Sequence, residues 1–129
     1  MKAILLDSDI LINVARGLDG RLLERWAELS GSDAVIAYSP VTVAEMWHGA
    51  RLHEYKLLEA LFRALTCVPI GPEIGGRAGD YLRQFAKSHS VELGDALIAA
   101  TASIHKLSLW THNRKHYPMK DCLFFSPAD

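Results

Sequence analysis

The chain begins with a short apolar run that stops at two aspartates. Residues 3–6 are Ala-Ile-Leu-Leu, Asp7-Ser8-Asp9 follows directly, and apolar residues resume at Ile10. Because Ser and Asp are favoured helix N-caps, this pattern predicts a buried parallel strand that leads straight into a helix. Ligands of open α/β sheets bind just outside the carboxyl ends of the strands, so we expect Asp7 to face a binding crevice.

Helix capping is the plainer explanation of these acids. A single capping residue stabilises a helix by about 1 kcal/mol, and the role is common. Capping needs only one acid, however, whereas Asp7 and Asp9 are separated by a single residue. Carboxylates this close repel and raise each other's pKa unless a cation or an arginine lies between them. The pair therefore favours a bound cation over capping alone.

The rest of the chain alternates apolar strands with amphipathic or buried helices. The first helix should run from Ser8 to Arg16 and end at Gly17, a residue suited to a left-handed C-cap. Further helices are expected over residues 18–30, 41–52, 54–65, 72–88 and 96–106, and further strands over 34–38, 67–70, 107–111 and 122–125. This alternation predicts an α/β fold of three layers, α/β/α, with a central parallel sheet and right-handed crossovers. Residues 1–129 should form a single domain.

Composition restricts the possible functions. Half of the 129 residues are apolar and the formal net charge is −1, so we expect a globular protein without an overall basic charge. A nucleic-acid partner would then have to be held by a local patch or through bound metal. Cys67 and Cys122 lack metal-ligand spacing and fit buried free thiols in a reducing compartment. Neither a signal peptide nor an apolar stretch of roughly 18 residues is visible, so we expect a cytoplasmic protein without membrane contact.

Two further acidic positions accompany later strands. Glu45 lies in the helix predicted after the second strand, while Glu92 and Asp95 lie at the start of the helix before the fourth strand. A surface glutamate and an aspartate that complements a helix dipole are the ordinary explanations. The topology can nevertheless bring Glu45 and Asp95 to the crevice beside Asp7. Oxygen ligands without Cys or His spacing suit Mg²⁺ or Mn²⁺ rather than zinc, and such a site acts naturally on a phosphate ester.

The segments that carry these acids resemble the PIN domain and, more closely, the VapC-type toxins of bacterial and archaeal toxin–antitoxin systems. They are residues 5–12, 39–45, 94–101 and 111–117, in the order that the family has and in a chain of the right size. The resemblance implies a sheet order near 3-2-1-4-5. It also implies a Mg²⁺-dependent endoribonuclease, with Mn²⁺ as a substitute ion, in which metal-activated water attacks an RNA phosphodiester bond.

The same resemblance implies roles for individual residues. Asp7, Glu45 and Asp95 fall on the first three acids of the family. Asp7 and Asp95 would bind the metal directly, and Glu45 would bind it or orient the water. His116 stands where the family often has a fourth acid, so tight binding of one ion is the safer expectation. The residues that would supplement the site through hydrogen bonds or water are Ser8, Asp9, Glu92 and Asn113.

Basic residues and apolar helix faces point to partners. The candidates for RNA-phosphate contacts are Arg16, Arg51, Arg114 and Lys115, although a surface ion pair is the more common role for such residues. The resemblance implies a homodimer and a cognate antitoxin whose peptide lies over the acidic crevice. A short sheet does not obviously need so many bulky apolar residues to cover it, which also favours a partner. These residues are Trp26, Trp47, Leu57, Leu58, Leu61 and Phe62.

Three alternative functions remain open from the sequence. Asp7-Ser8-Asp9 also fits the D-x-D motif of haloacid-dehalogenase-like phosphatases, although the chain lacks a suitable later lysine and second acidic pair. His116, which stands where the family often has an acid, favours a PIN-like binding module without catalysis. A metal-free nuclease could instead use His48, His112 or His116 as acid and base.

Overall fold

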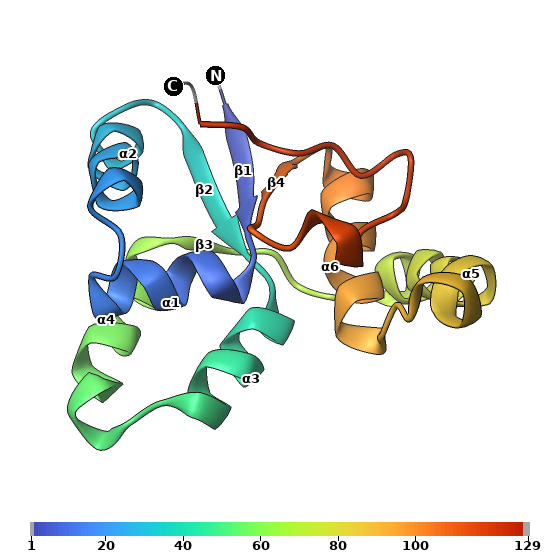
Figure 1. Ribbon diagram of the computed structural model, residues 1–129, viewed down its shortest axis with the longest axis horizontal. Coiled ribbons are helices and arrows are strands. Elements are labelled where there is room, and N and C mark those ends of the chain that lie inside the picture. Colours follow the sequence, from blue (N-terminus) through green and yellow to red (C-terminus); the bar gives the residue numbers. More distant parts are fainter. Residues whose placement is uncertain (1, 128–129) are drawn as a thin grey trace.

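The computed structural model describes residues 2–127 and contains a parallel sheet of four strands (Figure 1). The strands are β1 (Ala3–Leu6), β2 (Val35–Tyr38), β3 (Thr66–Cys67) and β4 (Ser108–Trp110), in the order β3-β2-β1-β4. Leu5 of the central strand β1 is in register with Ala37 of β2 and with Leu109 of β4. The predicted α/β class and the strand order 3-2-1-4 are confirmed.

The fifth strand, predicted over residues 122–125, is reduced to one parallel bridge between Leu109 and Phe124. Leu109 forms two backbone hydrogen bonds of 2.8 Å with this segment. Phe125 then packs against Trp110, with ring centroids 5.2 Å apart, and the ladder does not continue. The last strand therefore pairs over a single residue.

Six α-helices and two 3₁₀ turns accompany the sheet in the described chain. The helices are α1 (Ser8–Arg16), α2 (Gly20–Ser30), α3 (Pro40–Gly49), α4 (Tyr55–Ala64), α5 (Pro72–His89) and α6 (Leu93–His105). The 3₁₀ turns are η1 (Leu52–Glu54) and η2 (Arg114–His116). Within residues 2–127, no helix is both long enough and apolar enough to cross a membrane.

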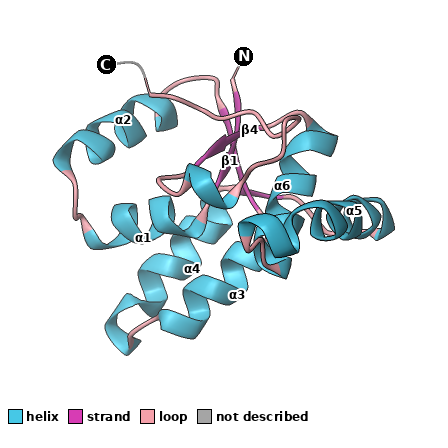
Figure 2. Ribbon diagram, turned by 45° about the vertical axis from the view of Figure 1, so that its right-hand side comes forward, coloured by secondary structure: helices cyan, strands magenta, loops and turns pink. Residues whose placement is uncertain are grey.

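Different helices cover the two faces of the sheet and produce three layers (Figures 1 and 2). Side chains alternate across a strand, so neighbours on β1 point to opposite faces. Leu5 packs into a buried cluster with α5 and α6, while Ile4 and Leu6 pack into a second cluster with α1, α2 and α4. The predicted three-layer arrangement is confirmed.

Because the strands are parallel, their carboxyl ends lie at the same edge of the sheet, and α1 and α3 begin there. Gly17 ends α1 in the left-handed conformation, with φ 62°. Ser39 caps α3, and its hydroxyl accepts a hydrogen bond of 3.0 Å from the Val41 N–H. Gly94 near the start of α6 approaches α3 closely, since a Cβ at this position would lie 3.4 Å from Val41 Cγ1. This contact brings the starts of α3 and α6 together.

An ion pair joins α1 to the segment after α3. Arg16 Nε donates to Glu54 Oε2 at 2.9 Å, and Arg16 Nη2 donates to Glu54 Oε1 at 3.3 Å. The Arg51 N–H donates to the same Oε1 at 2.9 Å. The hydrogen bonds from Arg16 and Arg51 lower the pKa of Glu54 to about 2. Glu54 is therefore ionised whenever the protein is near neutral pH.

Replacing Glu54 with glutamine should lower the melting temperature at pH 7. The pKa of Glu54 is lower in the folded protein than in the unfolded chain, so its ionised form stabilises the fold at pH values above the ordinary carboxyl pKa. This stabilisation is lost as the pH falls through about 2. The deficit of E54Q relative to the parent should therefore shrink between pH 5 and pH 3 in thermal unfolding. E28Q is the matched control, because Glu28 forms an exposed pair with Arg25. A pH-independent deficit would contradict this assignment.

The bulky apolar residues that suggested a docking surface are mostly packed inside. Leu58 is 3% exposed and belongs to a core cluster, against which Trp26, Trp47 and Phe62 pack partly buried. Leu61 is also half-buried, so Leu57 is the one residue of the six that is exposed, at 45%. That part of the prediction is wrong, because these side chains complete the layer over the sheet.

Both cysteines are free, as predicted, but only Cys122 is buried, whereas Cys67 is exposed. Cys67 ends β3, which is only two residues long and lies at the edge of the sheet. The prediction of two buried thiols is therefore wrong for Cys67.

Candidate active site

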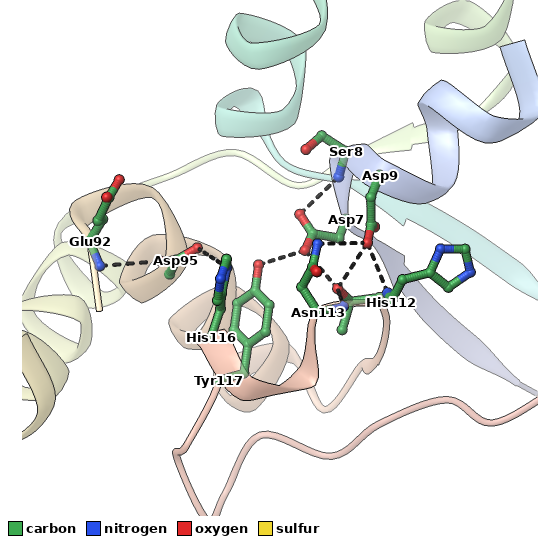
Figure 3. A network of polar contacts seen from close by, with 10 residues as sticks. Asp7, Ser8, Asp9, Glu92, Asp95, His112, Asn113, His116 and Tyr117 are labelled. Carbon is green, nitrogen blue, oxygen red and sulfur yellow. Dashed lines mark hydrogen bonds and ion pairs between the residues drawn. The ribbon is translucent and has the colours of Figure 1, made fainter. Parts of the chain in front are cut away.

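Asp7 lies at the carboxyl end of β1 and caps α1 (Figure 3). Its Oδ1 accepts a hydrogen bond of 2.8 Å from the Ser8 N–H. Its Oδ2 accepts one of 2.9 Å from Thr111 Oγ1 and one of 2.7 Å from the Tyr117 hydroxyl. The residue is 7% exposed and lines a cleft at this edge of the sheet. Asp7 thus combines capping with a position in the cleft, as the sequence allowed.

Asp9 anchors the loop that follows β4. Its Oδ2 accepts hydrogen bonds from the His112 N–H at 2.8 Å and from Asn113 Nδ2 at 3.2 Å, and Thr111 Oγ1 lies 3.4 Å away. Its Oδ1 is buried without a hydrogen-bond partner. Burial raises the pKa of Asp9, and the negative charge of Asp7 raises it further. Asp9 therefore holds Asn113 beside the cleft and keeps one carboxylate oxygen unpaired.

Glu45 of α3 and Asp95 of α6 line the same cleft as Asp7. Desolvation raises the pKa of Glu45, followed in size by the charge of Asp7. Burial is also the largest cause of the raised pKa of Asp95. Asp95 Oδ2 accepts a hydrogen bond of 3.2 Å from the Glu92 N–H and so caps its own helix. Acids from the end of β1, from α3 and from α6 share one cleft, and the charge of Asp7 opposes the ionisation of Glu45 and Asp95.

One wall of the cleft comes from the end of α5, the loop that follows it and the loop after β4. His116 Nδ1 lies 3.9 Å from Asp95 Oδ1, and the histidine side chain is half exposed. The other residues of this wall are His89, Ser90, Glu92, Asn113 and Lys115. The structure thus brings together the predicted site residues Ser8, Asp9, Glu92, Asn113 and His116 with Asp7, Glu45 and Asp95.

Several predicted residues lie elsewhere. Arg16 is paired with Glu54 and does not line the cleft, although it shares a smaller pocket with Glu45. Arg114 Nη2 donates to Ser126 Oγ at 2.7 Å, and its guanidinium lies over the Phe124 ring. Arg51, in the connection between α3 and η1, is not among the residues that line the cleft. Of the four phosphate-contact candidates, Lys115 is the one that lines the cleft.

Two residues that contact Asp7 were not singled out from the sequence. Thr111 and Tyr117 stand at the two ends of the 111–117 segment, and both are buried. The only sequence signal was their side-chain hydroxyls in a polar segment that directly follows a strand. That signal does not identify Asp7 as the acceptor, because 110 residues separate Tyr117 from it.

The donor set suits a hard divalent cation. Within residues 2–127, no group of three or more His, Cys, Asp or Glu side chains is arranged to hold a metal ion. Mg²⁺ however keeps several waters and commonly takes only one or two carboxylates from a protein. The cleft offers such carboxylate oxygens together with the unpaired Oδ1 of Asp9. The residues present fit one ion that retains part of its hydration shell.

Known proteins share both the sequence pattern and the fold. The sequence profile of the PIN domain family matches residues 4–120 of this chain. Ribonuclease VapC10 of Mycobacterium tuberculosis is 38% identical over 117 residues, which cover 90% of this chain and 86% of that protein. The resemblance inferred from the sequence therefore holds over most of the chain.

Solved structures agree with the fold. VapBC2 from Rickettsia felis, bound to a DNA fragment from its promoter, matches with a TM-score of 0.80 at 18% identity and covers 95% of this chain and 97% of the other. A toxin–antitoxin complex from Klebsiella pneumoniae matches with a TM-score of 0.75 at 22% identity and covers 98% of both chains. The chain therefore belongs to the PIN domain family, within which it is a VapC homologue.

Proposed function

We propose that this protein is a divalent-metal-dependent endoribonuclease and the toxin of a toxin–antitoxin pair. One observation carries the proposal. Carboxylates from β1, α3 and α6 line a single cleft in a chain that is 38% identical to a ribonuclease. The raised pKa values of Asp9, Glu45 and Asp95 support it, because a cation would offset the burial, and then the repulsion between the acids, that oppose their ionisation.

Each acid has a role that follows from its position. Asp7 and Asp95 would hold the ion from opposite sides of the cleft, and Glu45 would bind it or orient the attacking water. Asn113, hydrogen-bonded to Asp9, would support these ligands from the loop after β4. When bound, Mg²⁺ or Mn²⁺ supplies Lewis acidity and positive charge toward a phosphodiester.

The shape and charge of the cleft favour single-stranded RNA. Lys115 lines the cleft together with Asp7, so it can contact a phosphate beside the one being cleaved. The acids lie at the end of a sheet between helices, so a phosphate has to turn inward to reach them. Unpaired loops allow this movement more readily than an A-form duplex.

Protein partners form the second part of the proposal. The neighbours of known structure include a toxin–antitoxin complex, which supports an antitoxin as partner. The apolar side chains exposed around η1 and α4 are Leu52 at 81%, Tyr55 at 40% and Leu57 at 45%. An exposed group of this kind is typical of an interface. We infer that the protein forms a homodimer and binds a cognate antitoxin.

The alternatives differ in their support. Membership of the PIN domain family argues against the phosphatase. A metal-free nuclease would use His48, His112 or His116 as acid and base. Of these three, only His116 lines the cleft, and His112 lines a separate groove beside α2. The binding module without catalysis differs from the proposal only in activity, so an RNA cleavage experiment separates the two.

Digestion of a structured RNA with Mg²⁺, with Mn²⁺ and with EDTA tests the proposal. We expect cleavage in single-stranded loops that stops in EDTA and leaves no cyclic phosphate, because the attacking oxygen comes from water. The resemblance to the PIN domain family implies that water displaces the 3′ oxygen and leaves 5′-phosphate and 3′-hydroxyl ends. A histidine acid–base pair would instead use the neighbouring 2′-hydroxyl and leave a cyclic phosphate. Mass spectrometry of the products identifies the ends.

Two results would count against the metal assignment. Cyclic phosphates would indicate the histidine mechanism, as would cleavage that survives both EDTA and the Asp95→Asn substitution. An absence of cleavage with either metal, by a protein that is folded and free of antitoxin, would favour the binding module. A Lys115→Ala variant with unchanged cleavage would remove only the phosphate contact from the proposal.

A further inference from the structure

Two buried hydroxyls contact the same oxygen of Asp7. Tyr117, which is 3% exposed, and Thr111, which is 6% exposed, approach Oδ2 at 2.7 Å and 2.9 Å. The Asn113 N–H donates to Thr111 Oγ1 at 3.0 Å and so directs the Thr111 proton toward the carboxylate. Figure 3 shows the phenol of Tyr117 rising from the 111–117 segment toward Asp7. Hydroxyls from a single loop thus hold one side of this carboxylate.

The hydrogen bonds leave Asp7 one direction for a further ligand. A carboxylate has about four lone-pair directions, two on each oxygen. Thr111 and Tyr117 use both directions of Oδ2, and the Ser8 N–H uses one of Oδ1. The remaining direction belongs to Oδ1, in a residue that lines the cleft.

We propose that Tyr117, together with Thr111, is a positioning residue that fixes Asp7 as a one-oxygen ligand through Oδ1. The inference rests on the proposed metal-dependent function of the cleft. Tyr117 donates from its hydroxyl to Asp7 Oδ2 at 2.7 Å. Its ring belongs to the core cluster beneath α5 and α6, which keeps the hydroxyl in place.

Loss of the phenol oxygen should weaken metal binding without changing any ligand. In Tyr117→Phe one lone pair of Asp7 Oδ2 loses its donor, and the carboxylate can turn about its last side-chain bond. Removing a residue that orients a ligand typically reduces metal affinity by 10- to 100-fold. We expect a loss of about this size in the Mn²⁺ affinity of Y117F.

The chain offers a matched control. Tyr81 is likewise buried, at 4% exposed, and donates to Asp121 at 2.8 Å, but it does not line the cleft. Titration calorimetry with Mn²⁺ alone should therefore give parent-like affinity for Y81F and weakened affinity for Y117F. A general effect of losing a buried tyrosine hydroxyl would appear in both variants.

A second pair of variants covers the case in which Y117F does not fold. Thr111→Val removes the other hydroxyl from Asp7, and Thr101→Val removes a buried hydroxyl that donates to the Leu97 carbonyl at 2.8 Å. Only the first should weaken Mn²⁺ binding. Melting curves in EDTA establish which variants are folded at the titration temperature.

The outcomes separate this inference from the proposed function. Parent-like Mn²⁺ affinity in folded Y117F and T111V would overturn the positioning role and leave the metal site intact. Equal weakening in Y117F and Y81F would also overturn it, since the effect would not be specific to Asp7. An absence of Mn²⁺ binding by the parent would overturn the metal proposal and this inference together.

Discussion

Replacing Asp7 with asparagine should reduce RNA cleavage by roughly 10²- to 10⁴-fold, because a catalytic metal supplies several kcal/mol and each 1.4 kcal/mol is about tenfold in rate. Asparagine has nearly the size of aspartate but lacks the negative charge that would hold the ion. Asp7 is central to the site, since it lines the cleft with Glu45 and Asp95 and its charge raises the pKa of both. The same variant should also lose Mn²⁺ binding.

Cleavage of a fluorescent single-stranded RNA at saturating Mn²⁺, followed by calorimetric titration, measures both effects. Asp33→Asn is a suitable control, because Asp33 lies in the exposed turn before β2. The control should cleave and bind like the parent. An Asp7→Asn protein that keeps parent-like Mn²⁺ affinity would falsify the assignment of this cleft as a metal site.

The contacts of Asp7 also reverse an expectation drawn from charge alone. Where carboxylates converge, removing one charge should stabilise the protein without metal. Asp7 however accepts hydrogen bonds from Ser8, Thr111 and Tyr117, and an asparagine has only one oxygen to accept them. A buried donor without an acceptor costs roughly 1–3 kcal/mol, so Asp7→Asn should be less stable than the parent in EDTA.

Local patterns were sufficient to predict most of the fold. The apolar run before Asp7 and the Ser39-Pro40 pair each indicated where a strand gives way to a helix. Parallel strands place such transitions at one edge of the sheet, which is why Asp7, Glu45 and Asp95 could be expected in one crevice. Their shared cleft depends on topology more than on any particular side-chain contact.

The contacts that complete the site depend on side-chain geometry between distant residues. Tyr117 reaches Asp7 across 110 residues and Arg16 reaches Glu54 across 38, and neither separation follows a helix or strand period. The ring of Phe125 likewise packs against Trp110, 15 residues earlier in the chain. Such pairs form only after the layers have packed, so no pattern along the chain indicated them.

A divalent ion bound in the cleft should also stabilise the folded protein. A ligand that binds only the folded state stabilises it by RT ln(1 + [L]/Kd), or about 2.7 kcal/mol at one hundred times Kd. For a domain of this size that corresponds to a rise of about 10 °C in the melting temperature. We expect Mn²⁺ to produce a rise of this order at pH 7, followed by differential scanning fluorimetry with EDTA as reference.

The rise should be smaller at pH 5. The pKa values of Asp9, Glu45 and Asp95 are raised in the folded protein. At a pH just above the ordinary carboxyl pKa, the folded protein without metal therefore binds more protons than the unfolded chain does. Their contribution to its stability therefore falls as the pH rises from about 4 toward 7. Metal binding requires the ionised carboxylates, and the ion competes with fewer protons at pH 7 than at pH 5.

Glu45→Gln distinguishes repulsion within the cleft from a general effect of charge. Glu45 is exposed on the cleft wall and feels the charges of Asp7, Asp95 and Asp9. Without metal the variant should melt slightly higher than the parent at pH 7, by less than about 1 kcal/mol in stability because solvent screens an exposed group. With Mn²⁺ it should gain less than the parent. Glu59→Gln, on the exposed surface of α4, should match the parent in both conditions. A Glu45→Gln protein with the full Mn²⁺ response would exclude Glu45 as a metal ligand and leave it only the role of orienting water.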